Sequence, residues 1–295
     1  MIWFKKILKV LNILLDVCSY LCLLALLWIV FQMFCFSSFR IPTNSMEPSL
    51  IPGDMILVNK LVGGARLFDL FAALRKEPVN IHRVPGYGSF KRNDVLVFNF
   101  PYSAGWDRID FDVMKFYVKR CIALPGDTLA IRNGFFHVHG VNEELGNVEL
   151  QSYISHLTDT TSNFIVTALS YPQDKELGWT IKEFGPFHVP AKGQRVEMNR
   201  TNWLLYRRLI HWEQKEQPLL KENGRVYLRD SLITAYCFEQ NYYFMAGDKL
   251  TDSQDSRYWG LLPEEFIAGR ADYIWLSKER YTKEIRWDRF MKKIR

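Results

Sequence analysis

Ser45 has the clearest potential for nucleophilic chemistry in this chain. A serine hydroxyl attacks a carbonyl carbon once a neighbouring base removes its proton. Pro42 and Pro48 restrict the backbone on either side of Ser45, and Thr43 places a second hydroxyl two residues before it. Hydroxyls and prolines are also typical of turns that have no catalytic role. Residues 42–50 are therefore either an ordered turn or a nucleophile held in a fixed conformation.

Lys119 is the candidate base, because it interrupts the apolar segment 116–124. Strand alternation puts Lys119 and Arg120 on opposite faces, so we expect one to be solvated and the other to point into apolar surroundings. Desolvation disfavours an ammonium group and lowers its pKa from about 10.4 by up to several units, which makes a usable base. A lysine whose amine reaches back to water is the alternative.

A third polar segment, residues 247–260, contains Ser253, Asp255 and Arg257. Short polar side chains can satisfy the backbone of a structural turn. They can also orient a catalytic amine from behind. The residue types alone leave both interpretations open.

An uncharged stretch precedes these segments. From Val17 to Phe39 there is no charged residue across 23 positions, which as a helix would span about 35 Å against a hydrocarbon core of about 30 Å. Lys5, Lys6 and Lys9 precede it and favour a cytoplasmic N-terminus. The apolar run is longer than the core of a cleavable secretory signal, which holds about 7 to 15 residues. We therefore expect one transmembrane anchor.

After the anchor the sequence predicts a mainly β fold. The strands that we expect are Met55–Val58, Val95–Phe98, Phe116–Leu124, Thr128–Ile131 and Phe135–His139. Asn133-Gly134 predicts a tight hairpin turn. The spacing of apolar residues in 67–74 predicts a short amphipathic helix, which lies either near the membrane or against the core.

Composition narrows the class of partner. The net charge of +6 is concentrated beside the anchor and in the tail 283–295, where basic and large apolar residues alternate. This pattern favours a bilayer over nucleic acid as partner, although a solvated terminus is the alternative. Cys121 and Cys237 are the only cysteines outside the apolar span. We expect two buried free thiols, and a single Cys121–Cys237 disulfide in an oxidising compartment is the alternative.

No metal or other cofactor is expected. The six histidines form no His-Glu-x-x-His motif, and none lies near Ser45, Lys119 or Ser253 in the sequence. A Ser-His-Asp triad is not supported either, since no Gly-x-Ser-x-Gly segment occurs.

Taken together, the three polar segments resemble bacterial type I signal peptidases, which are membrane-anchored serine proteases with a Ser/Lys dyad. The resemblance covers about residues 38–60, 92–134 and 243–275. The motifs that carry it are Ser45-Met46-Glu47-Pro48, Tyr117-Val118-Lys119-Arg120, Leu124-Pro125-Gly126-Asp127, Gly247-Asp248 and Ser253-Gln254-Asp255-Ser256-Arg257. Their order along the chain matches the family.

The resemblance implies a role for each site residue. It makes Ser45 the nucleophile, Lys119 the general base, and Ser253 a hydrogen-bond partner of the lysine amine. It assigns the oxyanion hole to the Ser45 N–H and the Thr43 hydroxyl, where one donor is worth about 10² to 10³ in rate. It also implies that Asp255 and Arg257 pair to hold the loop of Ser253.

Some positions depart from the commonest family pattern. Thr43 replaces a serine but keeps the hydroxyl, and Lys249 and Leu250 stand where the family often has Asn and Arg. Ala123 and Ser49 replace a frequent glycine and threonine. None of these changes removes a chemical group that the mechanism needs.

The resemblance also implies a fold and a domain organisation. We expect a signal-peptidase-like β-sheet catalytic domain with an inserted β-rich subdomain, preceded by one transmembrane helix. The expected limits are 1–40 for the cytoplasmic N-terminus and anchor, 41–139 and 237–280 for the catalytic domain, 140–236 for the insertion and 281–295 for a basic amphipathic tail.

The function implied is the removal of signal peptides from exported preproteins after small residues, at the extracytoplasmic (periplasmic) face of a bacterial inner membrane. Two alternatives remain open. One is a membrane-tethered β-rich binding or assembly protein without activity. The other is a self-cleaving regulator with the same dyad, although its usual DNA-binding segment is absent and an anchor stands in that place.

Overall fold

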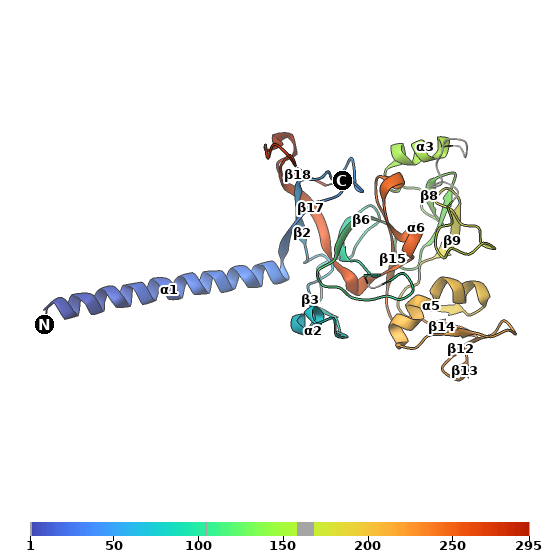
Figure 1. Cartoon of the computed structure of the whole chain (residues 1–295), viewed down its shortest axis with the longest axis horizontal. Coiled ribbons are helices and arrows are strands. Elements are labelled where there is room, and N and C mark those ends of the chain that lie inside the picture. The colour runs from blue at the N-terminus through green and yellow to red at the C-terminus, as the bar shows by residue number, and fades with distance from the viewer. Residues whose placement is uncertain (1, 104, 158–167, 295) are drawn as a thin grey trace.

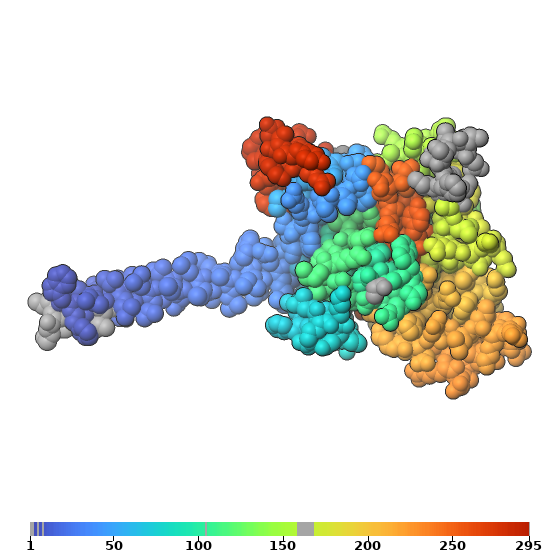
Figure 2. Space-filling view, viewed as in Figure 1, coloured from blue at the N-terminus to red at the C-terminus, as the bar shows by residue number. Residues whose placement is uncertain are grey.

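The computed structural model describes residues 2–103, 105–157 and 168–294. The N-terminal helix α1 (Ile2–Phe34) projects away from a compact body (Figures 1 and 2). Its stretch Lys9–Phe34 is long and apolar enough to cross a membrane, with a mean hydropathy of 2.5. The predicted C-terminal limit at Phe39 is therefore wrong. Residues from Phe36 onward bond a neighbouring strand instead of continuing the helix.

One antiparallel sheet forms the body and confirms the mainly β prediction. Its strand order is β1–β2–β17–β5–β6–β15–β16, with β18 paired to β17. The strands are β1 (Phe36–Arg40), β2 (Asp54–Asn59), β5 (Val95–Asn99), β6 (Phe116–Ala123), β15 (Tyr242–Ala246), β16 (Leu262–Pro263), β17 (Ile267–Ser277) and β18 (Lys292–Lys293). The strand β6, which carries Lys119, lies between β5 and β15.

A second sheet has the order β8–β7–β9. It joins the expected catalytic domain, which contains β7 and β8, to the expected insertion 140–236, which contains β9. Its strands are β7 (Thr128–Arg132), β8 (Phe135–Val138) and β9 (Phe184–His188). The turn between β7 and β8 is the predicted Asn133-Gly134 hairpin, in which both residues have positive φ, 48° and 84°. Asparagine and glycine are the residues that adopt this conformation most readily. All five predicted strands are thus confirmed to within two residues.

Within residues 140–157 and 168–236, the structure has two helices that the sequence analysis did not identify. Helix α3 (Val148–His156) follows the capping residue Asn147, and α5 (Arg200–Gln214) follows Asn199. On α5 the buried residues are Leu205, Tyr206, Leu209 and Ile210. Their i, i+1, i+4, i+5 spacing is a helical signal that could have been found in the sequence.

The remaining elements are short. Helix α2 (Leu70–Leu74) begins after Asp69, whose carboxylate accepts from the Ala72 N–H, so the helix is shorter than the predicted 67–74. The other short helices are α6 (Ser256–Trp259), η1 (Leu250–Asp252), η2 (Glu264–Phe266) and η3 (Trp287–Arg289). The other strands are β3 (Arg66–Leu67), β4 (His82–Arg83), β10 (Arg195–Glu197), β11 (Leu219–Leu220), β12 (Val226–Leu228), β13 (Ser231–Leu232) and β14 (Ala235–Cys237).

The core has two parts on opposite faces of the main sheet. On β5, Leu96 and Phe98 belong to the larger part, whereas Val95 and Val97 belong to the smaller one. Every residue of β5 is buried, as the continuous apolar run predicted. The larger part also contains Phe184 from the segment 140–236, so this segment shares its core with the sheet that carries Lys119.

Cys121 and Cys237 are both free. Cys121 is buried on β6, as expected. Cys237 is exposed, so the prediction of a buried thiol is wrong there. It lies on the short edge pairing β10–β14, where its thiol donates to the Gly193 carbonyl.

Candidate active site

The turn that carries Ser45 connects β1 to β2 and is fixed by packing. Met46 and Leu50 are fully buried in the smaller part of the core, and the Leu50 N–H donates to the Met46 carbonyl. The Ser45 carbonyl accepts from the Lys249 N–H at 3.1 Å. Both the side chains and the backbone around Ser45 are therefore held in one conformation.

Lys119 reaches the same place from β6. Its Nζ lies 2.5 Å from the Ser45 Oγ, although 74 residues separate the two in sequence. The side chain is only 3% exposed. The amine also lies 5.9 Å from the centroid of the Tyr117 ring. Lys119 therefore points inward, and the alternative in which its amine reaches water is wrong.

Burial changes the acidity of this amine. Desolvation lowers the pKa of Lys119 from 10.5 to about 8. The nearby carboxylate of Asp255 opposes this shift, and the charge of Arg257 adds to it. Since desolvation exceeds the attraction of the carboxylates, a sizeable fraction of Lys119 is neutral near pH 8 and can accept a proton.

Ser45, Thr43 and Lys119 line one cleft of about 480 Å³. Thr43 is exposed to this cleft. In the parts of the chain that the structure describes, neither the Ser45 N–H nor the Thr43 hydroxyl makes a hydrogen bond. Both donors are thus free to bind an oxygen atom that enters the cleft.

Behind the lysine, Asp255 and Arg257 form a buried ion pair. The Arg257 Nε and Nη2 donate to the two Asp255 oxygens at 2.9 and 2.8 Å. Burial alone would raise the pKa of Asp255, but the charge and hydrogen bonds of Arg257 outweigh it and hold this pKa below its ordinary value. Arg257 also donates to the Leu250 carbonyl, so the pair closes the loop 250–257.

Ser253 lies inside this loop, and its hydroxyl donates to Asp255 at 2.7 Å. The hydrogen bond to the Lys119 amine that the resemblance implies is not among the contacts of the described residues, and it stays a prediction. Because the Ser253 hydrogen is committed to Asp255, the lone pairs of its oxygen remain available to accept from an amine.

Gly247 lets the serine turn and this loop approach each other. A Cβ at this position would lie 2.1 Å from the Ser253 Oγ and 2.6 Å from the Ser45 carbonyl oxygen. Any side chain would therefore displace one of the two serines.

Comparisons with known proteins identify the family of the chain. The sequence profile of the family described as "Signal peptidase, peptidase S26" matches residues 14–276. The chain belongs to this family. Members are serine endopeptidases that remove signal peptides, and this is the function of the chain.

Curated relatives named signal peptidase I cover most of the chain. The protein of Buchnera aphidicola subsp. Schizaphis graminum is 28% identical over 88% of this chain and 73% of its own length. The protein of Aquifex aeolicus is 28% identical over 88% of this chain and 82% of its own. A solved structure of a signal peptidase I from Enterococcus faecalis covers 62% of this chain and 96% of its own at 19% identity, with a TM-score of 0.29, too low to compare the folds.

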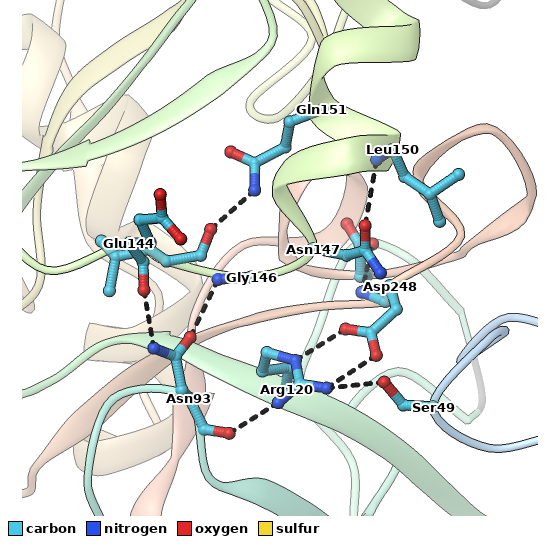
Figure 3. A network of polar contacts seen from close by, with 12 residues as sticks. Ser49, Asn93, Arg120, Glu144, Gly146, Asn147, Leu150, Gln151 and Asp248 are labelled. Carbon is cyan, nitrogen blue, oxygen red and sulfur yellow. Dashed lines mark hydrogen bonds and ion pairs between the residues drawn. The ribbon is translucent and has the colours of Figure 1, made fainter. Parts of the chain in front are cut away.

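Arg120, next to Lys119 in this signal peptidase, is also buried, so the prediction that one of the two is solvated is wrong. It can be buried because its charge is paired. Its Nε and Nη2 donate to the two oxygens of Asp248 at 2.7 Å each (Figure 3). Its Nη2 also donates to the Ser49 Oγ at 3.0 Å. Arg120 thus ties β6 to the turn that carries Ser45, a role that the sequence analysis missed.

A second buried arginine holds the same turn from the C-terminal tail. Arg289 Nη2 donates to the Ser49 carbonyl at 2.9 Å and to Asp54 at 2.6 Å. Asp54 is fully buried and also accepts from the Ile51 N–H. The tail is therefore docked on the body at this residue, which no local sequence pattern indicated.

Three of the departures from the family pattern have structural explanations. Lys249 forms an ion pair with Glu47 at 2.9 Å, which links the last motif to the serine turn. Leu250 is buried in the larger part of the core. Ser49 keeps the hydroxyl that Arg120 binds.

Proposed function

We propose that Ser45 and Lys119 are the catalytic dyad with which this signal peptidase cleaves exported preproteins. The observation that carries the proposal is the 2.5 Å approach of a buried, weakly basic lysine amine to a serine hydroxyl in an open cleft. No other base is required, since the neutral amine can accept the serine proton directly.

The reaction follows from this geometry. Neutral Lys119 takes the proton of the Ser45 hydroxyl while Oγ bonds to the scissile carbonyl carbon. The carbonyl oxygen becomes negative and binds the Ser45 N–H and the Thr43 hydroxyl. Lys119 then gives its proton to the leaving nitrogen as the C–N bond breaks, which leaves an ester on Ser45. A water molecule, deprotonated by Lys119, hydrolyses this ester and releases the signal peptide.

The loop behind the dyad would orient the amine. We assign to Ser253 the role of accepting one N–H of Lys119 while it donates to Asp255, so that the amine lone pair faces Ser45. Asp255 and Arg257 would keep this loop closed. The preference for small residues before the scissile bond stays part of the proposal and is supported by the apolar side chains that line the cleft, among them Phe39, Ile41 and Val118.

The surface near the anchor supports contact with the bilayer. On α2, Leu70, Phe71 and Leu74 are 51%, 73% and 51% exposed. Leu70 lines a cavity of about 240 Å³ together with Met33, which lies near the end of α1. Figure 1 shows α2 close to the place where α1 joins the body. Apolar side chains exposed next to a membrane-spanning helix are stabilised when they enter the interface.

The tail offers a second such contact, because Trp287 and Met291 are 70% and 52% exposed beside basic residues. We propose that α1 crosses the bacterial inner membrane once, with its basic N-terminus in the cytoplasm and the cleft on the extracytoplasmic face. The division into a catalytic domain and the insertion 140–236 belongs to the same proposal.

The test uses the full chain in liposomes with a preprotein substrate and mass spectrometry of the products. Ser45→Ala should abolish cleavage, because it removes the hydroxyl that Lys119 contacts in the described structure. Ser231→Ala is the matched control, since Ser231 is an exposed serine on β13. Equal cleavage by the Ser45→Ala variant would refute the dyad, and cleavage after large residues would refute the proposed specificity.

A further inference from the structure

Asn93 joins the catalytic sheet to the inserted segment. Its backbone carbonyl accepts from Arg120 Nη1 at 2.8 Å. Its side-chain amide donates to the Glu144 carbonyl and accepts from the Gly146 N–H, both at 2.8 Å. Figure 3 shows this residue between Arg120 on one side and the loop 144–146 on the other.

The backbone conformation of Asn93 sets the directions in which its carbonyl and its side chain point. Its φ is 66°, in the left-handed region that asparagine adopts more readily than most residues. Its N–H donates to the Cys121 carbonyl at 2.7 Å, which ties the turn before β5 to β6. The carbonyl therefore faces Arg120 while the side chain faces the insertion.

The loop 144–146 is rigid on its own side. Gln151, which is buried, donates to the Leu145 carbonyl at 2.6 Å and accepts from the Phe136 N–H at 2.8 Å. Asn147 caps α3 immediately after the loop. Helix α3 in turn packs against η1, which precedes Ser253. Asn93 is thus held against a well-ordered part of the insertion.

From Arg120, the hydrogen bonds continue to the turn that carries Ser45. Arg120 binds Ser49, four residues after Ser45, and also binds Asp248. The residue after Asp248 is Lys249, whose N–H donates to the Ser45 carbonyl. Both routes from Arg120 therefore end on the turn of Ser45.

We propose that Asn93 is a positioning residue through which the insertion holds Arg120, and with it the turn of Ser45, in the reactive geometry. The inference rests on the proposed roles of Ser45 and Lys119. It gives the insertion a part in catalysis that does not require contact with the substrate.

The test is Asn93→Gly, which tolerates the positive φ and keeps the carbonyl for Arg120 but removes both side-chain hydrogen bonds. We expect kcat per active site, counted with a covalent serine-acylating inhibitor, to fall about fivefold to tenfold with KM changed less than about twofold. Asn133→Gly is the matched control, because Asn133 also has positive φ and its side chain makes no hydrogen bond within the described residues. Its kcat and KM should equal those of the native chain.

A double-mutant cycle with Ser49→Ala tests the route. If Asn93 acts through Arg120 on Ser49, the double variant should lose less activity than the product of the two single losses. A kcat of Asn93→Gly within about twofold of the native value, with only its melting temperature lowered, would make Asn93 merely structural and overturn the inference. Multiplicative losses would overturn the route. A native chain that the inhibitor does not label at Ser45 would instead refute the proposed function.

Discussion

Replacing Lys119 by methionine should abolish activity and yet stabilise the fold at neutral pH. Burial lowers the pKa of Lys119 from 10.5 to about 8. A shift of about 2.5 units corresponds to about 3 kcal/mol at 1.36 kcal/mol per unit. This free energy is the cost of keeping the charged amine in the folded state below pH 8. Methionine has a similar length and carries no charge, so it fills the site without this cost.

The sign of the pH dependence follows from proton binding. Between pH 8 and 10.5 the unfolded chain binds the lysine proton and the folded chain does not, so the free energy of unfolding of the native chain rises with pH. The Lys119→Met variant lacks this rise. Its advantage over the native chain should therefore shrink by about 3 kcal/mol between pH 7 and pH 10.5.

The assay is thermal unfolding of the two full-length proteins in the same detergent at several pH values. For a body of this size, about 3 kcal/mol corresponds to about 6 to 12 °C in melting temperature. Lys192→Met is a control, because the Lys192 side chain is exposed to water, so its replacement should change the melting temperature by a similar amount at every pH. A difference between Lys119→Met and the native chain that stays constant from pH 7 to 10.5 would refute the assignment of a desolvated, weakly basic amine.

Three further predictions concern the same site. The value of kcat/KM should fall about tenfold per pH unit well below the Lys119 pKa of about 8, because only the neutral amine accepts a proton. Asp252→Asn should shift this fall in kcat/KM to lower pH, because the Asp252 charge raises the Lys119 pKa, while the asparagine oxygen can still accept from Asn44. Asp230→Asn is the control. A pH profile that Asp252→Asn leaves unchanged would contradict the reasoning. Gly247→Ala should lower kcat by at least about tenfold, because the added methyl group would displace Ser253 or Ser45, and a kinetic assay that finds native turnover would exclude this tight contact.

Much of the fold could be predicted because the signals are local. The hairpin at Asn133-Gly134 follows from the backbone preferences of two adjacent residues. The buried strand β5 follows from a continuous apolar run. The end of α1 could not be predicted from the absence of charge, because Phe36–Phe39 are uncharged like the helix and leave it only by pairing with β2.

The site shows the same division. The sequence by itself determined which residues could react, since Ser45, Lys119 and the loop of Ser253 carry the required groups in a recognisable order. Only the tertiary structure decided which charges are buried and what pairs with them. Arg120 meets Asp248 across 128 residues, and Arg289 meets Asp54 across 235. No local pattern encodes such partners, because a buried charge is stable only where the whole fold brings its counter-charge within hydrogen-bonding distance.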